Sequence, residues 1–246
     1  MRYKFSILLA LIVSTQIFAQ YSNSSYTKSE YNTFDLDDLS FGLRLSPSIS
    51  WVDIQHNDAT ADGAALKFNV GIIADYEINS ILSIISGVNY NNAGGYAFDN
   101  QSLDNTSTKD NYKINYTSVE VPLGLRLQTN NISNTDYYIQ GGVSASFILK
   151  ANEKYKSSIA DTEIPSLDII SLTAPTYVGF FGTIGVEFTV AKTVGLFIDV
   201  TYKNSTSSIA IGNNYVNPTD LVYDHGYTEP IDIRSGSMDF SVGIMF

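Results

Sequence analysis

The sequence predicts an all-β protein, a closed antiparallel up-and-down transmembrane β-barrel of about eight strands. Three observations predict this fold. Eight segments alternate apolar and polar residues with the period of two that a β-strand imposes. Short turns and long polar loops alternate between these segments, as they do in bacterial outer-membrane barrels. The chain also begins with the basic, apolar and small residues, in that order, of a secretory signal peptide.

The composition excludes several classes of protein. The 246 residues include no cysteine, which rules out disulfides, a thiolate metal site and a cysteine nucleophile. A formal net charge of -11 argues against nucleic acid as a partner, because its phosphates would be repelled. Beyond the signal region, no apolar run approaches the roughly 20 residues that a spanning helix needs.

The chain divides into three predicted parts. Residues 1–19 are the expected signal peptide, cleaved after Ala19. Residues 20–38 contain few apolar side chains, and we expect a periplasmic N-terminal tail, either disordered or docked on the barrel mouth. Residues 39–246 are expected to form the outer-membrane β-barrel. An even number of strands with short periplasmic turns places both termini in the periplasm.

The alternation is clearest at the C-terminus, where one face of a strand is wholly apolar: Met238, Phe240, Val242, Ile244 and Phe246. The same pattern predicts seven more strands, at residues 40–51, 66–78, 82–90, 119–128, 139–149, 178–190 and 194–203. Short turns are expected at 78–81, 129–136 and 191–193, and long external loops at 53–65, 93–111, 150–176 and 204–235. The apolar stretch 164–172 would either extend strands above the membrane or add a hairpin, making the count ten.

A soluble β-sandwich would also alternate, and it is the alternative fold. The second face of these strands, however, is rich in Gly and Ser and carries isolated charges of both signs. Such a face suits the crowded polar lumen of a narrow membrane barrel. We expect a lumen charge network of Arg44, Lys67, Asp75, Glu77, Glu120, Arg126, Glu187, Asp199, Lys203 and Asp239. In it each charge would offset the desolvation of a neighbour, with a proton or ion path as the alternative.

The predicted lumen is closed. The interior of an eight-stranded barrel is just wide enough for side chains to fill, and Phe181 and Phe197 are assigned inward together with Arg44 and Arg126. Aromatic residues fall near strand ends, as expected of the girdles at both membrane interfaces. The outer rim would hold Trp51, Tyr90, Tyr112, Tyr116 and Tyr202, and the periplasmic rim Tyr76, Tyr137, Phe188 and Phe246.

Two prolines lie inside predicted strands, where each removes a ladder hydrogen bond. Near Pro122 the apolar phase also slips, because Tyr112 and Tyr116 are even-numbered whereas the apolar residues from Val119 onward are odd-numbered. A β-bulge near residues 117–118 would absorb the slip. For Pro47 we expect only a local irregularity.

The segment Val119-Glu120-Val121-Pro122-Leu123-Gly124-Leu125-Arg126 resembles the "LEIPLLLK" signature strand of the PorT-like, or porin-family, outer-membrane β-barrel proteins widespread in Bacteroidetes. The cleavage region of the signal peptide and the terminal Phe246 fit that group too. The resemblance implies an outer-membrane barrel, and Phe246 resembles the C-terminal signal that barrel-assembly machinery reads. A role in protein secretion would follow from the family only by analogy.

Chemical function is less visible. His56 and His225 fall in predicted external loops beside aspartates, an arrangement that a surface hydrolase or a shared metal site would use. The acidic loop 53–65 would also suit calcium, but solvation at an anionic surface is the simpler interpretation. No Ser-His-acid spacing or HExxH-type motif is present. We therefore expect no catalytic residues, no cofactor and no metal.

The expected function is that of a non-enzymatic outer-membrane barrel with a structural or interaction role, such as an accessory to envelope assembly or protein secretion. A small-solute porin and a surface hydrolase are the alternatives. The expected partners are outer-membrane lipid, the barrel-assembly machinery during insertion, and envelope or secretion proteins.

Overall fold

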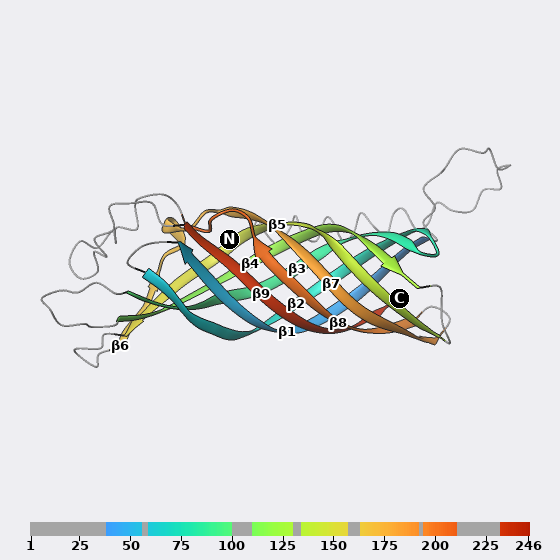
Figure 1. Cartoon of the computed structure of the whole chain (residues 1–246), viewed down its shortest axis with the longest axis horizontal. Helices are drawn as coiled ribbons and strands as arrows, with labels where there is room; N and C mark the ends of the chain where they lie inside the picture. The colour runs from blue at the N-terminus through green and yellow to red at the C-terminus, as the bar shows by residue number, and fades with distance from the viewer. Residues whose placement is uncertain are drawn as a thin grey trace, which may run out of the picture. The chain divides into compact units, whose positions relative to one another are not determined.

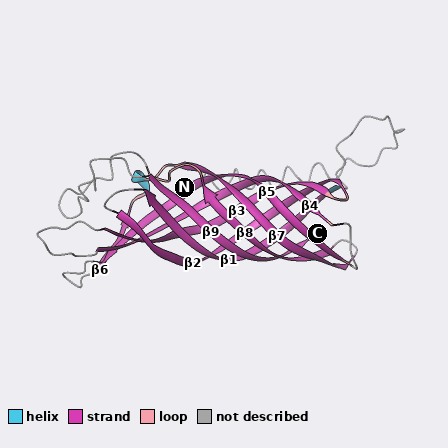
Figure 2. Ribbon diagram, in the orientation of Figure 1, coloured by secondary structure: helices cyan, strands magenta, loops and turns pink. Residues whose placement is uncertain are grey.

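The computed structural model describes residues 38–55, 59–99, 110–129, 134–156, 163–191, 194–210 and 232–246 (Figure 1). Almost all of these residues lie in β-strands (Figure 2). No helix within these ranges is long and apolar enough to cross a membrane. The predicted signal peptide, most of the predicted tail, and both histidines lie outside the described residues.

Nine strands and one short helix follow one another along the chain. They are β1 (Leu39–Gln55), β2 (Ala59–Asn79), β3 (Leu82–Asp99), β4 (Asp110–Gln128), β5 (Thr135–Lys156), β6 (Glu163–Asp168), the 3-10 helix η2 (Ile170–Leu172), β7 (Thr176–Ala191), β8 (Val194–Ser205) and β9 (Asp232–Met245).

Eight of these strands close into a barrel. The sheet order is β4-β3-β2-β1-β9-β8-β7-β5, and β4 also pairs with β5, which joins the two ends of the sheet. Every pairing is antiparallel. The prediction of a closed barrel of about eight strands is confirmed. The stretch 164–172 does not make the barrel ten-stranded, because β6 pairs only with the end of β5 and η2 follows it.

The barrel has its apolar side chains outside and its polar side chains inside. On β1, Leu43 is 51% exposed and Leu45 49%, whereas Ser46 and Ser48, which follow them in the alternate phase, are each 1% exposed. The same inversion runs through the predicted strand segments, as alternation with an outward apolar face requires. A contiguous apolar surface of this kind needs an apolar surrounding such as lipid.

The strands run further than the sequence predicts at one end of the barrel. Residues 53–65 and 93–111 were expected to be loops, but β1 continues to Gln55, β2 begins at Ala59, β3 continues to Asp99 and β4 begins at Asp110. The expected loop 150–176 likewise contains the end of β5, all of β6 and η2. Backbone pairing persists there although the outward side chains are no longer apolar, so the alternation that reveals a lipid-facing strand is lost.

An apolar cluster fills this extended end from the inside. Val52, Ile114, Tyr116, Ile148 and Ile233 are among its buried members, and the segment after β6 packs onto it through Ile169. The backbone of this segment is held to the barrel by Ile169 N–H, which donates to the Ala151 carbonyl at 3.1 Å. The barrel interior is therefore polar in one part and apolar in the other.

This change of polarity corrects two predictions about β4. Tyr116 is 3% exposed and lies inside the barrel, not on its outer rim, and Ile114 lies inside with it. The even-numbered residues of β4 therefore face inward on both sides of the apparent slip, because the interior itself changes from polar to apolar. A register shift does occur at Thr117/Ser118, as predicted, but the extra residue is Leu149 on β5.

The two prolines interrupt pairing without changing its register. Pro47 pairs with Phe68 of β2, but the ladder to β9 skips Ser46 and Pro47 and then resumes in the same register. Pro122 similarly leaves a gap in the ladder to β3. The short turn between β2 and β3 is confirmed, and Asn79 Oδ1 stabilises it by accepting the N–H groups of Ile81 and Leu82 at 3.0 Å each.

Candidate functional site

The polar half of the interior contains three cations and five carboxylates that contact one another across the barrel. We call these eight residues the interior network: Arg44, Arg126, Lys203, Asp75, Glu120, Glu187, Asp199 and Asp239. They come from β1, β2, β4, β7, β8 and β9. All of their ion pairs except Lys203–Asp239, which joins the consecutive strands β8 and β9, connect strands that do not follow one another in the sequence.

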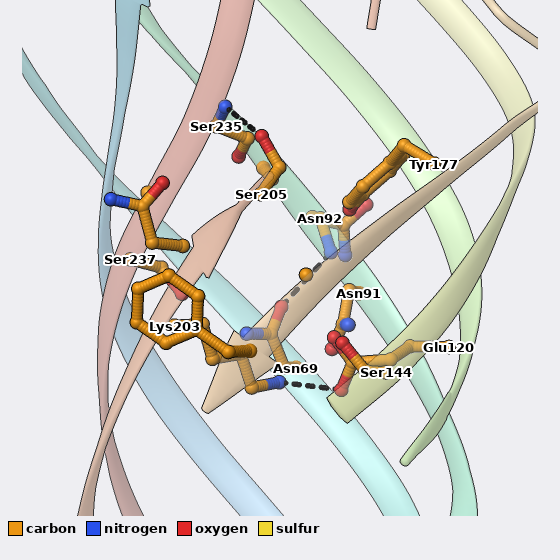
Figure 3. A pocket seen from close by; sticks show the side chains of 15 residues that line it. Asn69, Asn91, Asn92, Glu120, Ser144, Tyr177, Lys203, Ser205, Ser235 and Ser237 are labelled. Carbon is orange, nitrogen blue, oxygen red and sulfur yellow. Dashed lines mark hydrogen bonds and ion pairs between the residues drawn. The ribbon is translucent and has the colours of Figure 1, made fainter. Parts of the chain in front are cut away.

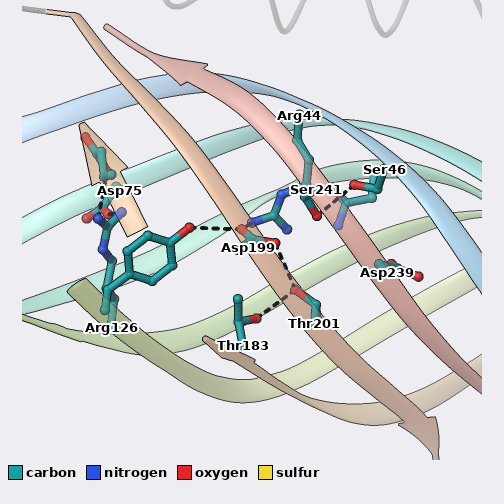
Figure 4. A network of polar contacts seen from close by, with 12 residues as sticks. Arg44, Ser46, Asp75, Arg126, Thr183, Asp199, Thr201, Asp239 and Ser241 are labelled. Atoms are coloured by element: carbon teal, nitrogen blue, oxygen red, sulfur yellow. Dashed lines mark hydrogen bonds and ion pairs between the residues drawn. The ribbon is translucent and has the colours of Figure 1, made fainter. Parts of the chain in front are cut away.

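Arg126 on β4 is the centre of the first group. Its Nη1 lies 3.2 Å from Asp75 Oδ2 on β2, and its Nη2 lies 2.7 Å from Glu187 Oε2 on β7 (Figure 4 shows Arg126 and Asp75). The guanidinium also lies 4.0 Å from the centre of the Tyr138 ring, a cation–π contact. One side chain thus holds together three strands and an aromatic ring.

Asp199 on β8 is the centre of the second group. Arg44 Nη2 lies 3.0 Å from its Oδ2, and the Tyr138 hydroxyl donates to the same oxygen at 3.0 Å (Figure 4). Thr201 donates to the other oxygen of Asp199 and lies 2.9 Å from the hydroxyl of Thr183. Because Tyr138 contacts both Arg126 and Asp199, it links the first group to the second.

Lys203 on β8 is the centre of the third group. Its Nζ lies 2.8 Å from Glu120 Oε1 and 3.1 Å from Asp239 Oδ2. Asn89 Nδ2 donates to the same oxygen of Glu120 at 2.9 Å, and the Ser48 hydroxyl donates to Asp239. Each carboxylate in this group therefore has a cation and a neutral donor, which is what a buried charge needs to offset its desolvation.

Two of the ten residues proposed from the sequence are placed apart from these groups. Glu77 is exposed near the end of β2 and forms no salt bridge within the described ranges. Lys67 donates from its Nζ to Asn115 Oδ1 at 2.6 Å instead of pairing with a carboxylate. Alternation predicts a face of a strand, but not whether a side chain near the end of that strand, such as Glu77, meets a partner. Lys67 lies where the β2–β3 ladder is irregular, between Ala64 and Val70, and its side chain reaches the outward face of β4 instead of the lumen.

Several neutral residues of the network escaped the sequence analysis. Tyr138, Asn89 and Thr201 each bond to a charged member, and all three are at most 5% exposed. Their signal in the sequence was available: a polar side chain in the inward phase of a strand with an outward apolar face. The predicted inward placement of Phe181 and Phe197 matches their burial, at 7% and 3% exposed.

A small cavity lies beside the third group (Figure 3). It has a volume of about 30 Å³ and is lined by Asn69, Asn91, Glu120, Ser144 and Lys203, among others. Asn91 Oδ1 is buried there without a hydrogen-bond partner. A second cavity of about 20 Å³ lies near Arg44 and Phe181. Since one water needs roughly 10–15 Å³, the first cavity has room for two or three waters and the second for one or two.

The terminal Phe246 closes the barrel by backbone pairing with β1. Its N–H donates to the Phe41 carbonyl at 2.8 Å, and its carbonyl accepts the Phe41 N–H at 3.0 Å. Its ring is 57% exposed on the outside. Within the described part of the chain, no group of three or more His, Cys, Asp or Glu residues is arranged to hold a metal ion.

Comparisons with known proteins bear on this barrel. The family model "Outer membrane protein beta-barrel domain" matches residues 18–209. No curated protein matches the chain. Similar solved structures include Ail, the attachment invasion locus protein of Yersinia pestis, which is 15% identical, with 85% of this chain and 99% of that chain covered and a TM-score of 0.38.

Two further structures are similar to the chain. Neisserial surface protein A is 16% identical, with 84% of this chain and 97% of that chain covered and a TM-score of 0.39. The outer membrane protease OmpT from Escherichia coli is 11% identical, with 89% of this chain and 99% of that chain covered and a TM-score of 0.49.

Proposed function

We infer the function from one premise: this chain belongs to the family of outer membrane protein β-barrel domains. We propose that it is a closed, non-enzymatic barrel of the outer membrane with a structural or interaction role. Both termini face the periplasm in this proposal, so the apolar cluster and β6 lie at the external end. A PorT-like accessory role in envelope assembly or protein secretion is the finer form of the same proposal.

The observation that carries the proposal is the filled interior. Arg44, Arg126 and Lys203 bridge the polar half from strand to strand. Phe181 and Phe197 are buried in the same half: the Arg44 guanidinium lies 5.6 Å from the centre of the Phe197 ring, and Phe181 lines a cavity together with Arg44 and Lys203. The apolar cluster fills the other half. The two interior cavities described above have room for only a few waters, which supports a barrel that does not pass solutes.

Liposome swelling tests whether the barrel passes solutes. Vesicles that contain the refolded protein are diluted into an isotonic solution of a small sugar, and the change in light scattering is followed. A closed barrel gives the same trace as empty vesicles, with a known general porin as the positive control. Sugar-dependent swelling in proportion to the amount of protein would refute the closed barrel and favour the porin.

Two further experiments test the interaction role and the side of the membrane on which the termini lie. Crosslinking in the native envelope, followed by mass spectrometry of a tagged copy, is expected to recover envelope or secretion proteins in stoichiometric amount. Recovery of the barrel alone would refute the accessory role. A protease added to intact cells is expected to spare a tag inserted directly after the expected signal peptide, at residue 20, and cleavage of that tag would reverse the assigned orientation.

A further inference from the structure

An unusual set of lysines lies on the outer surface of the barrel, next to the lipid-facing belt. On β4, Ile114 and Tyr116 are buried inside, so Lys113 and Asn115 lie on the outward face. Lys113 Nζ lies 5.0 Å from the centre of the Tyr96 ring. Tyr96 is the neighbour of Lys113 in the β3–β4 ladder and is exposed, which confirms that this lysine faces out.

Two lysines of β5 continue the same surface. Lys150 and Lys154 are exposed, while Ala151 and Glu153 are buried. In the β4–β5 ladder Lys154 lies directly opposite Lys113, and Lys150 lies opposite Thr117. Side chains that are directly opposite in an antiparallel ladder lie on the same face, so Lys113 and Lys154 are direct neighbours. Lys150 lies on the same face, four residues or roughly 13 Å along β5 from Lys154.

A fourth lysine reaches this surface from β2. Lys67 Nζ donates to Asn115 Oδ1 at 2.6 Å, which brings its charge onto the outward face of β4 between Lys113 and Thr117. We call Lys67, Lys113, Lys150 and Lys154 the lysine surface. It is built from three strands, β2, β4 and β5, and does not depend on any residue outside the described ranges.

The lysine surface concentrates positive charge on an acidic protein. The chain has a formal net charge of -11 with only 14 Lys and Arg residues in total. Among the residues whose side chains the structure describes, none of the four lysines forms a salt bridge. Asp168 lies opposite Asn152 in the β5–β6 ladder and accepts the Ile170 N–H, and Asp62 lies at an irregularity of β2. Like charges opposite each other, such as Lys113 and Lys154, cost stability, so an anion here would relieve a repulsion.

The position of the lysine surface along the barrel axis, next to the lipid-facing side chains, indicates which anion it binds. Directly beside it on the outward face, Phe147 and Leu149 of β5 are 46% and 56% exposed, and Leu66 and Phe68 of β2 are 85% and 51% exposed. Lipid acyl chains cover such side chains, and the lysines lie at the level where the lipid headgroups begin. A lipid with phosphates on its headgroup would contact the apolar side chains with its acyl chains and the lysine surface with its phosphates.

We propose that the lysine surface binds the headgroup phosphates of a phosphorylated glycolipid in the outer leaflet. The site rests on the proposed orientation, which places this end of the barrel outside. It takes a single lipid class: acyl chains lie along the apolar faces of β2 to β5, and phosphates lie among the four ammonium groups.

Native mass spectrometry of the refolded, detergent-solubilised full-length protein tests the site, with lipid A carrying both phosphates as the probe. We expect one lipid to be retained per barrel, and dephosphorylated lipid A to be lost. Each lysine near an anionic headgroup contributes roughly a fivefold change in affinity. The triple variant Lys113→Gln, Lys150→Gln, Lys154→Gln should therefore bind roughly a hundredfold more weakly, and the same three positions changed to Arg should keep binding at the wild-type level.

Arg234→Gln is the matched control. It removes one positive charge from β9, away from the lysine surface, where Arg234 pairs with Asp232. This variant should leave lipid binding unchanged, whereas the single variant Lys154→Gln should weaken it. Unheated migration in gels shows whether each variant is folded. Equal retention of dephosphorylated lipid, wild-type binding by a folded triple variant, or displacement of the lipid by millimolar inorganic phosphate would each overturn the site. Swelling and conductance are separate measurements, so a failure here is distinct from a failure of the closed barrel.

Discussion

Replacing Arg126 by methionine would leave the carboxylates of Asp75 and Glu187 inside the barrel without their cation. The three side chains are only 6%, 10% and 21% exposed, so water screens the loss weakly. Removing one partner of a buried ion pair typically costs about 3–5 kcal/mol, because the remaining charge is desolvated and unpaired. We expect the free energy of unfolding to fall by about that amount.

A second variant separates the charge from the volume. Adding Asp75→Asn and Glu187→Gln to Arg126→Met removes both orphaned charges and keeps the side chains nearly the same size. Most of the lost stability should return, because neutral or apolar replacement of a whole buried ion cluster is often close to neutral. The control is Arg234→Gln, whose ion pair with Asp232 is more exposed, at 39% and 33%, and should change stability by no more than about 1 kcal/mol.

The assay is urea unfolding of the barrel in lipid vesicles, followed by fluorescence. Trp51 is the single tryptophan and lies 6.2 Å from Tyr202 on the outer surface, so its emission reports loss of the barrel wall. A loss below about 1 kcal/mol for Arg126→Met would show that its ion pairs do not support the fold. The same conclusion would follow if the triple variant were as unstable as the single one.

Three more substitutions test other parts of the barrel. Gly94→Ala places a Cβ against the Ile114 carbonyl at φ 134°, so we expect a loss of at least about 1–3 kcal/mol in the urea assay, whereas Gly182→Ala, with nothing within 4 Å of its Cβ, should be near neutral. Tyr116→Ala empties part of the apolar cluster and should cost about 3–5 kcal/mol, against about 1 kcal/mol for Tyr116→Phe, which loses only the hydroxyl contact. Phe246→Ala keeps both backbone hydrogen bonds to β1, so refolding into plain vesicles should be unchanged while insertion in cells falls, measured as the yield of folded barrel in outer-membrane fractions; equal yields would exclude an assembly signal at this residue.

The membrane-embedded part of the fold could be predicted from the sequence because lipid imposes one rule on every strand. Leu43 and Leu45 must face outward, so Arg44 between them must face inward. The period of two then assigns a face to the other residues of each strand. This is why the eight strands and the inward faces of most charged residues follow from alternation alone. It is also why the short turn after Asn79 was visible: the apolar pattern stops on both sides of it.

The rule fails where the barrel leaves the lipid. Above the belt the interior becomes apolar, so Tyr116 and Ile114 face inward just as Ser118 does, and the apolar phase seems to slip although β4 does not. The outward side chains there are polar or charged, as at Lys113 and Lys150, and the alternation that identifies a strand is gone. For this reason the strand ends beyond the lipid-facing belt were predicted to be loops.

The partners within the interior network could not be predicted for a different reason. Alternation assigns a residue to a face, but which carboxylate meets Arg126 depends on the register of every strand between them. Arg126 pairs with Asp75 across β3 and with Glu187 across β5, and the register of β5 includes the extra residue Leu149. Opposite charges on inward faces therefore predict that ion pairs form, but the register of the closed sheet determines which residues pair.

Single-channel recording in a planar lipid bilayer tests the filled barrel most directly. The refolded protein is added to one side of a bilayer in concentrated potassium chloride, and insertion is verified afterwards by recovery of the folded protein from the membrane. We expect a flat current at all moderate voltages, because ion pairs, Phe181, Phe197 and the apolar cluster occupy the lumen. Regular conductance steps that scale with the inserted protein would contradict it and show that the barrel is a channel.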